Sequence, residues 1–159
     1  MPTAHRHPHV HTADCHTPAE RLAEADALVR ERGARFTTMR RATYDFLLGE
    51  KAPLSAYDIL ARMETRLHKK LAPPTVYRAL DFLLEQGLIH RLETGNAYLV
   101  CDHPGAAHDS VYLVCTVCGT TQEIDDHAVS DLLEAKARAY GFRPDKQVIE
   151  VQGHCRRCL

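Results

Sequence analysis

The chain has 159 residues, of which 45% are hydrophobic and 26% charged, the composition of an ordinary globular protein. Lysine and arginine total 20 against 21 acidic residues, so net charge gives no argument for binding nucleic acid. No apolar run approaches the roughly 18 residues of a membrane span, and the first twenty residues lack a secretory signal, so we expect a cytoplasmic protein with no membrane segment.

Residues 1–16 are predicted to be a tail. They have little apolar content and are rich in metal-binding side chains: His5, His7, His9, His11, Cys15 and His16. Such a segment either captures zinc or is simply a flexible extension, and the second interpretation is slightly favoured.

Four helices and a hairpin are predicted between residues 17 and 100. Capping boxes at 17–20 and 55–58 begin the first and third helices, the second begins at Thr37 or Thr38, and the fourth runs over 75–86 behind two prolines. Strands are expected at 88–92 and 97–100, joined by a turn. Helices followed by a short hairpin predict a winged helix-turn-helix domain over residues 17–100.

A second unit is predicted after a hinge at residues 101–109, which contain Pro104-Gly105 and few apolar side chains. Strands at 111–115 and 120–124, a helix over about 126–140 and a strand at 147–152 form a small α/β domain over residues 110–159. The fold class is therefore α+β, with a winged helix-turn-helix domain followed by a small α/β domain.

Two C-x-x-C pairs are the strongest chemical signal in the sequence, formed by Cys115 with Cys118 and by Cys155 with Cys158. This spacing lets two thiolates bind one ion from a tight turn, and a closed four-sulfur shell suits structural Zn²⁺. Two disulfides or an iron-sulfur cluster are the alternatives, and a reducing compartment favours zinc over disulfides.

A second candidate set has mixed nitrogen, sulfur and oxygen ligands, which also suit Zn²⁺. It draws on the predicted wing, the hinge and the second domain: His90, Cys101, His103, His108 and Glu123. A site divided across a hinge would fix the angle between the domains when filled. From spacing alone, an ordinary structural role explains these residues equally well. His90 and His108 would then be surface imidazoles, Cys101 a small buried residue and Glu123 a solvated charge on a strand.

The helix behind Pro73-Pro74 has the pattern of a recognition helix. One stripe is apolar, and it leaves Thr75, Tyr77 and Arg78 near the outer N-terminal face, where such a helix meets the major groove. Arg78 could pair with guanine, and Tyr57 could reach a base or phosphate. Nearby basic side chains could bind phosphates: Arg40, Arg41, Lys51, Lys69 and Lys70. The alternative is a helical bundle with a solvated polar face.

Together these segments resemble the ferric uptake regulator (Fur) family of bacterial metalloregulators. The resemblance is carried by residues 36–41, 55–58 and 73–90 and by the two C-x-x-C pairs, and it extends from about Pro18 to Leu159. Within the family the chain is most similar to the zinc uptake regulator (Zur) branch. This implies a homodimer with N-terminal DNA-binding and C-terminal dimerisation domains, which represses zinc-uptake genes when zinc is abundant.

The resemblance also implies two zinc ions per subunit. The structural zinc falls on Cys115, Cys118, Cys155 and Cys158, and the regulatory zinc on His90, Cys101, His108 and Glu123. The hinge is a residue shorter than in close relatives, so His103 could replace or assist His108.

Other functions remain as alternatives. The first is a family member that senses another metal or peroxide. Two observations argue against iron, manganese or nickel sensing: the H-x-H-D-H run of iron-type members is mostly missing before Cys115, and Cys101 favours a thiophilic metal. A zinc-storage protein is the second. A deaminase-type zinc enzyme needs an H-x-E motif before P-C-x-x-C, and neither is present, so we expect no enzymatic activity.

Overall fold

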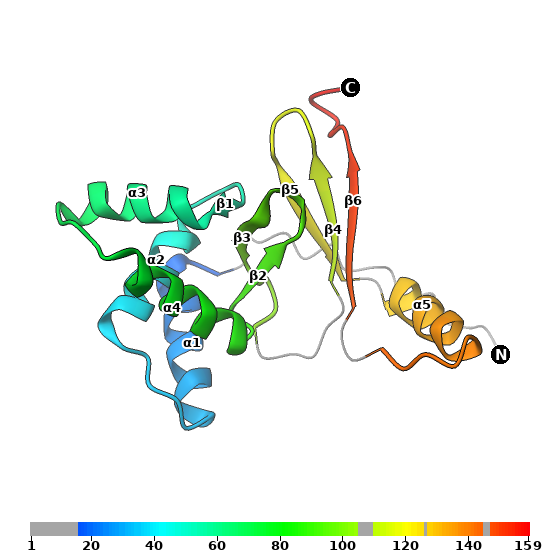
Figure 1. Cartoon of the computed structure of the whole chain (residues 1–159), viewed down its shortest axis with the longest axis horizontal. Coiled ribbons are helices and arrows are strands. Elements are labelled where there is room, and N and C mark those ends of the chain that lie inside the picture. Colours follow the sequence, from blue (N-terminus) through cyan, green and yellow to red (C-terminus); the bar gives the residue numbers. More distant parts are fainter. Residues whose placement is uncertain (1–15, 105–109, 126, 145–146) are drawn as a thin grey trace.

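The computed structural model describes residues 16–104, 110–125, 127–144 and 147–159. Four helices gather at one end of the molecule, a small winged sheet lies in the middle, and a second sheet with one helix forms the other end (Figure 1). The predicted α+β class is confirmed. Among the described residues, no helix is long and apolar enough to cross a bilayer. The tail prediction for residues 1–16 lies almost entirely outside the described residues.

The helices begin where the sequence places their caps. Helix α1 (Pro18–Glu31) begins at Thr17, which forms the full capping box with Glu20. Helix α2 spans Thr38–Leu48, and α3 (Ala56–Leu67) begins at Ser55, whose hydroxyl accepts the Asp58 N–H at 3.1 Å. Helix α4 (Pro73–Glu85) begins two residues earlier than predicted, because proline fits the first helical turn, where N–H groups have no helical partner.

The wing contains the predicted hairpin and one strand that the sequence did not reveal. Strands β2 (Ile89–Leu92) and β3 (Ala97–Val100) pair antiparallel through a turn that includes the 3-10 segment η2 (Thr94–Asn96). The additional strand β1 (Leu54–Ser55) pairs with β3, giving the order β1-β3-β2. A two-residue strand has too short a pattern to recognise, and here the pairing itself creates the strand.

The hydrophobic core of the described residues lies in this N-terminal part. Its buried cluster draws on all four helices and on the wing, with Tyr44, Ile59, Leu80 and Leu83 fully enclosed. Apolar spacing along α3 predicts that Leu67 faces inward together with Ile59, Leu60 and Met63, and for Leu67 this prediction is wrong. Leu67 is 42% exposed, because α3 ends there and His68 turns the chain through a left-handed conformation.

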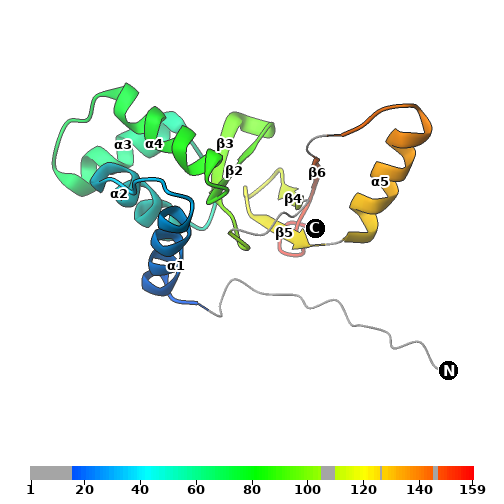
Figure 2. The same cartoon turned by 90° about the horizontal axis from the view of Figure 1, so that it is seen from below.

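The second unit is a three-stranded sheet with a helix beside it. Strands β4 (Ser110–Cys115) and β5 (Thr121–Asp125) pair antiparallel, and β6 (Val148–Gly153) runs parallel to β4 on its other side. Helix α5 (His127–Ala139) connects β5 to β6. It lies on the side of this sheet opposite to helices α1–α4 (Figure 1 and Figure 2). Successive side chains of β4 point to opposite faces, so Tyr112 faces the wing and Leu113 faces away.

Candidate metal centres and DNA-binding surface

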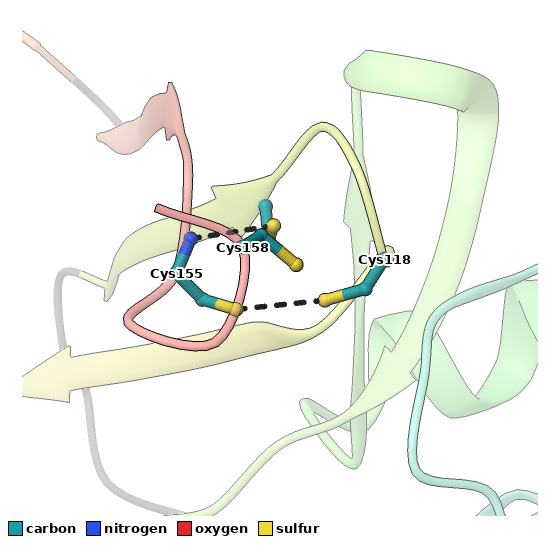
Figure 3. A group of neighbouring side chains, drawn as sticks. Cys118, Cys155 and Cys158 are labelled. Atoms are coloured by element: carbon teal, nitrogen blue, oxygen red, sulfur yellow. Dashed lines mark hydrogen bonds between the residues drawn. The ribbon is translucent and has the colours of Figure 1, made fainter.

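The four cysteines of the C-x-x-C pairs meet at one end of the second sheet. Cys115 ends β4 and Cys118 lies in the turn before β5, while Cys155 and Cys158 lie in the turn after β6 (Figure 3). Because β6 runs parallel to β4, both pairs reach the same end of the sheet. The four sulfur atoms all lie within 4.8 Å of one another, and all four cysteines are free of disulfides.

The cluster has the electrostatics of a cation site. The backbone N–H of Cys155, 3.3 Å from the Cys115 sulfur, together with the N–H of Cys118, lowers the pKa of Cys115 to about 6. Hydrogen-bonding contacts with the sulfur atoms of Cys155 and Cys118 favour the neutral thiol of Cys158, and with the nearby charge of Cys115 they raise its pKa to about 12, so without a cation the four sulfurs do not all ionise. Four thiolates therefore need a compensating cation, and these residues fit Zn²⁺.

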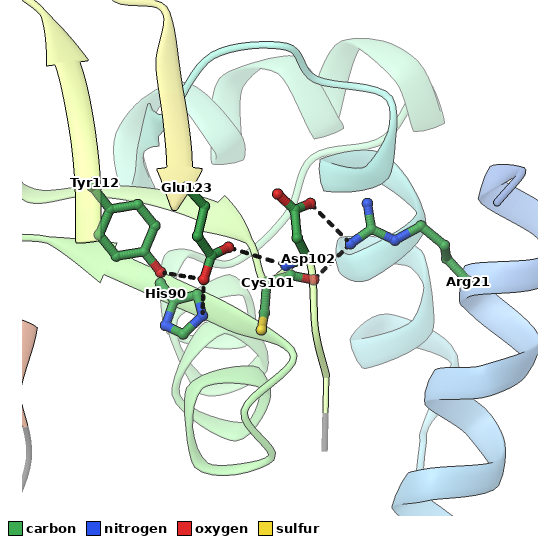
Figure 4. Close-up of polar contacts among 6 residues, drawn as sticks. All are labelled: Arg21, His90, Cys101, Asp102, Tyr112 and Glu123. Atoms are coloured by element: carbon green, nitrogen blue, oxygen red, sulfur yellow. Dashed lines mark hydrogen bonds and ion pairs between the residues drawn. The ribbon is translucent and has the colours of Figure 1, made fainter. Parts of the chain in front are cut away.

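A second cluster lies where the wing meets the second sheet. His90 comes from β2, Cys101 follows β3, and Glu123 comes from β5, with one ligand atom of each within 4.8 Å of the others (Figure 4). Cys101 is fully buried, and the His90 Nε2 lies 3.7 Å from a Glu123 oxygen. The three chemically different donors fit a borderline-soft ion such as Zn²⁺.

Hydrogen bonds orient the Glu123 carboxylate. The Tyr112 hydroxyl donates to one oxygen at 3.3 Å, and the Asp102 backbone N–H donates to the other at 3.2 Å. Arg21 of α1 donates to the Cys101 carbonyl at 2.6 Å and approaches the Asp102 carboxylate at 3.4 Å (Figure 4). Burial and the nearby Glu123 carboxylate raise the pKa of Asp102. A cavity of about 590 Å³ lies beside this cluster and is lined in part by Arg21, Asp102 and Glu123.

Two of the predicted ligands are not part of this cluster as the structure describes it. His108 lies outside the described residues. His103 is described, but its ring nitrogens are not among the ligand atoms that converge with His90, Cys101 and Glu123. Sequence reasoning overlooked Tyr112 and Arg21, because an aromatic strand residue and a helix arginine 80 residues from Cys101 carry no ligand pattern.

The predicted DNA-contacting side chains lie on the helical unit. Tyr57, near the start of α3, is 74% exposed, and Tyr77 and Arg78 are exposed on α4, whereas Thr75 is half-buried. Some of the basic residues considered for phosphate binding have partners within the chain: Arg41 pairs with Asp26 and Lys70 with Glu64, and the Arg40 guanidinium lies over the ring of Phe82.

The far face of the second sheet exposes apolar side chains. Leu113 of β4 and Val151 of β6 are register partners, so they lie side by side on the face turned from the wing. Leu132 and Leu133 of α5 are also well exposed. Exposed apolar side chains of this kind are typical of a surface that another subunit covers.

Comparison with known proteins identifies relatives over most of the chain. Residues 31–152 match the model of the ferric uptake regulator family. The zinc uptake regulation protein of Escherichia coli K12 is 36% identical over 146 residues, covering 90% of this chain and 84% of the relative. A solved zinc uptake regulator complexed with zinc and DNA is 36% identical, with a TM-score of 0.83 over 90% of this chain and 95% of that one.

A second solved relative, XcZur, is 38% identical and is known in two forms. The holo form has a TM-score of 0.78, covering 86% of this chain and 95% of that one. The apo form has a TM-score of 0.52, covering 89% and 97%. The backbone described here is therefore more similar to the holo form.

Proposed function

The chain belongs to the ferric uptake regulator family, and we propose that it is a zinc-responsive repressor that binds operator DNA as a homodimer when loaded with zinc. The observation that carries this proposal is the convergence of His90, Cys101 and Glu123 from the wing and the second sheet. A single ion held there would tie a DNA-binding domain at 17–100 to a dimerisation domain at 110–159 across the hinge at 101–109.

The two clusters support the proposal of two zinc ions per subunit. The four-sulfur cluster would hold a structural ion, because a closed shell leaves no coordination position for a substrate. The regulatory ion would be held by His90, Cys101, Glu123 and His108. The buried Cys101 thiol favours zinc over iron or manganese, which prefer harder ligands.

Zinc acts by selecting one angle between the domains. An ion can shift this equilibrium only by binding one arrangement more tightly than the other. The ligands His90 and Glu123 belong to different units, so the ion binds tightly only where the units meet. Linkage then requires operator DNA to raise zinc affinity by the same factor as zinc raises DNA affinity, typically through about 1 to 3 kcal/mol.

Two exposed surfaces support the proposed partners, which are operator DNA and a second copy of the chain. The exposure of Tyr77 and Arg78 on α4 supports contacts of these side chains with the major groove, and Thr75 and Tyr57 of α3 would add to them. Dimerisation through the second unit would cover the apolar face that includes Leu113 and would pair two recognition helices with successive half-sites.

A gel shift tests this function directly. Upstream regions of neighbouring zinc-uptake genes are incubated with the protein in zinc, in a chelator, or in iron or manganese. We expect sequence-specific binding that zinc restores after chelation and that the other metals do not. Operator binding that does not depend on the metal, or the absence of any sequence-specific binding, would contradict the proposal.

A further inference from the structure

A second contact between the wing and the second sheet lies apart from the metal ligands. One oxygen of the Glu150 carboxylate on β6 accepts the backbone N–H of Glu93 at 2.6 Å, and the other accepts that of Thr94 at 3.1 Å. Two residues further along β6, the Gln152 side chain donates to the Thr94 hydroxyl at 2.8 Å. We call these four residues the wing latch.

The strand register places the latch and the metal ligands on one face. Tyr112 of β4 pairs with Glu123 of β5 on one side and with Glu150 of β6 on the other. These three side chains therefore form a row across the sheet, with Glu123 and Glu150 about 10 Å apart, or two strand spacings. Between them the Tyr112 ring packs against His90 of the wing, with 5.5 Å between ring centroids.

The Glu150 contact is charge-assisted. Two successive N–H groups at the tip of a turn form a small anion-binding concavity, and one carboxylate satisfies both of them. Partial burial raises the pKa of Glu150, but the hydrogen bonds from Thr94 and Glu93 outweigh it, so the pKa lies below its usual value. Glu150 is therefore ionised at neutral pH.

Two separate attachment points constrain an angle better than one. A contact at the metal ligands alone would leave the wing free to pivot about that point, whereas a second contact about 10 Å away opposes the pivot. We propose that Glu150, supported by Gln152, is a positioning residue that holds the wing against β6 and so presets the domain angle at which His90, Cys101 and Glu123 converge. This inference rests on the proposed function.

The latch raises zinc affinity without touching zinc. When only a fraction of the protein occupies the binding-competent arrangement, the apparent dissociation constant rises by the inverse of that fraction. Loss of a charge-assisted hydrogen-bonded contact shifts such an equilibrium about tenfold. Zinc at saturation restores the arrangement by its own differential affinity.

The experiment compares Glu150→Ala, Glu150→Gln and Gln152→Ala with the unaltered chain. Regulatory zinc affinity is measured by competition with a chelator, and operator affinity at limiting and saturating zinc. For Glu150→Ala we expect about tenfold weaker regulatory zinc binding, a similar loss of operator affinity at limiting zinc, and operator affinity within about twofold of the unaltered chain at saturation. Glu150→Gln keeps an acceptor oxygen and should lose less, and Gln152→Ala less again.

The controls separate the latch from a general structural role. Glu31→Ala, at an exposed carboxylate on α1, should leave both affinities unchanged. All variants should remain dimers that retain the four-sulfur zinc. Unchanged zinc affinity in both Glu150 variants would overturn the latch, as would a loss of operator affinity that persists at saturating zinc.

Failure of the proposed function gives a different result. An unaltered chain that binds a second zinc but ignores operator DNA would contradict the function, and the zinc affinities of the variants would still decide the latch. An unaltered chain that takes up only one zinc per subunit would overturn both.

Discussion

Replacing Cys118 by serine should unfold the second unit. Among the described residues, the main hydrophobic cluster lies entirely in the N-terminal part, and apart from the candidate ligand Cys115 the buried apolar side chains of the second unit are Val111 and Tyr112. Each contributes about 1.5 to 3 kcal/mol at most. A structural zinc contributes about 10 to 16 kcal/mol of folding free energy in small zinc domains, so the ion outweighs this core.

Circular dichroism, light scattering and zinc content are the assays for this variant. Cys118→Ser should lose the dimer, much of the secondary structure of residues 110–159 and the tightly held zinc. Val117→Ser changes an exposed side chain in the same turn and is the matched control, which should resemble the unaltered chain. A soluble, dimeric and fully folded Cys118→Ser protein would refute the structural role of the cluster.

Further predictions concern DNA, the tail and pH. Arg78→Ala should weaken binding to the cognate site by about 1 to 3 kcal/mol with zinc content unchanged, and equal weakening on random DNA would make Arg78 a phosphate contact. Lys69→Ala should weaken both DNAs alike and reduce the salt dependence measured in the same titrations. Deleting residues 2–16 should leave zinc-dependent operator binding intact, and a lost metal response would place the tail in the sensor. The pKa of Glu150 is lowered in the folded protein, so its stabilising contact is present above its ordinary value of 4.5 and is lost as pH falls through the lower folded value. The zinc affinity ratio between the unaltered chain and Glu150→Ala should therefore stay constant between pH 6 and 8, and a ratio that falls across this range would contradict the assignment.

Local signals predicted the elements well. The capping box at Thr17, the two prolines before α4 and the turn at 94–96 are short patterns with a direct backbone cause, and each element lies within about two residues of its expected bounds. Strand β1 was missed because it exists only through pairing with β3. The exposure of Leu67 was missed because apolar spacing does not indicate where a helix leaves the core.

The C-x-x-C spacing indicated the four-cysteine cluster from the sequence. The contacts around the second cluster, at His90, Cys101 and Glu123, could be found only from the tertiary structure. Two C-x-x-C pairs specify a four-sulfur site whenever the strands return to one end of the sheet. The contacts of Tyr112 with Glu123, of Arg21 with Cys101 and of Glu150 with Glu93 join residues that are 11, 80 and 57 positions apart in the sequence. None of these residues belongs to a recognisable sequence motif. Such contacts follow only from the strand register and from how the wing meets the second sheet.

Titrating zinc into the Cys101→Ser variant while measuring operator affinity and zinc per subunit tests the central claim most directly. The variant should be a folded dimer that retains the four-sulfur zinc, binds one zinc per subunit instead of two, and shows no zinc-stimulated operator binding. The same substitution at Cys118 should instead unfold the second unit, which separates sensing from structure. A zinc response in Cys101→Ser equal to that of the unaltered chain would contradict the assignment of His90, Cys101 and Glu123 as the sensor.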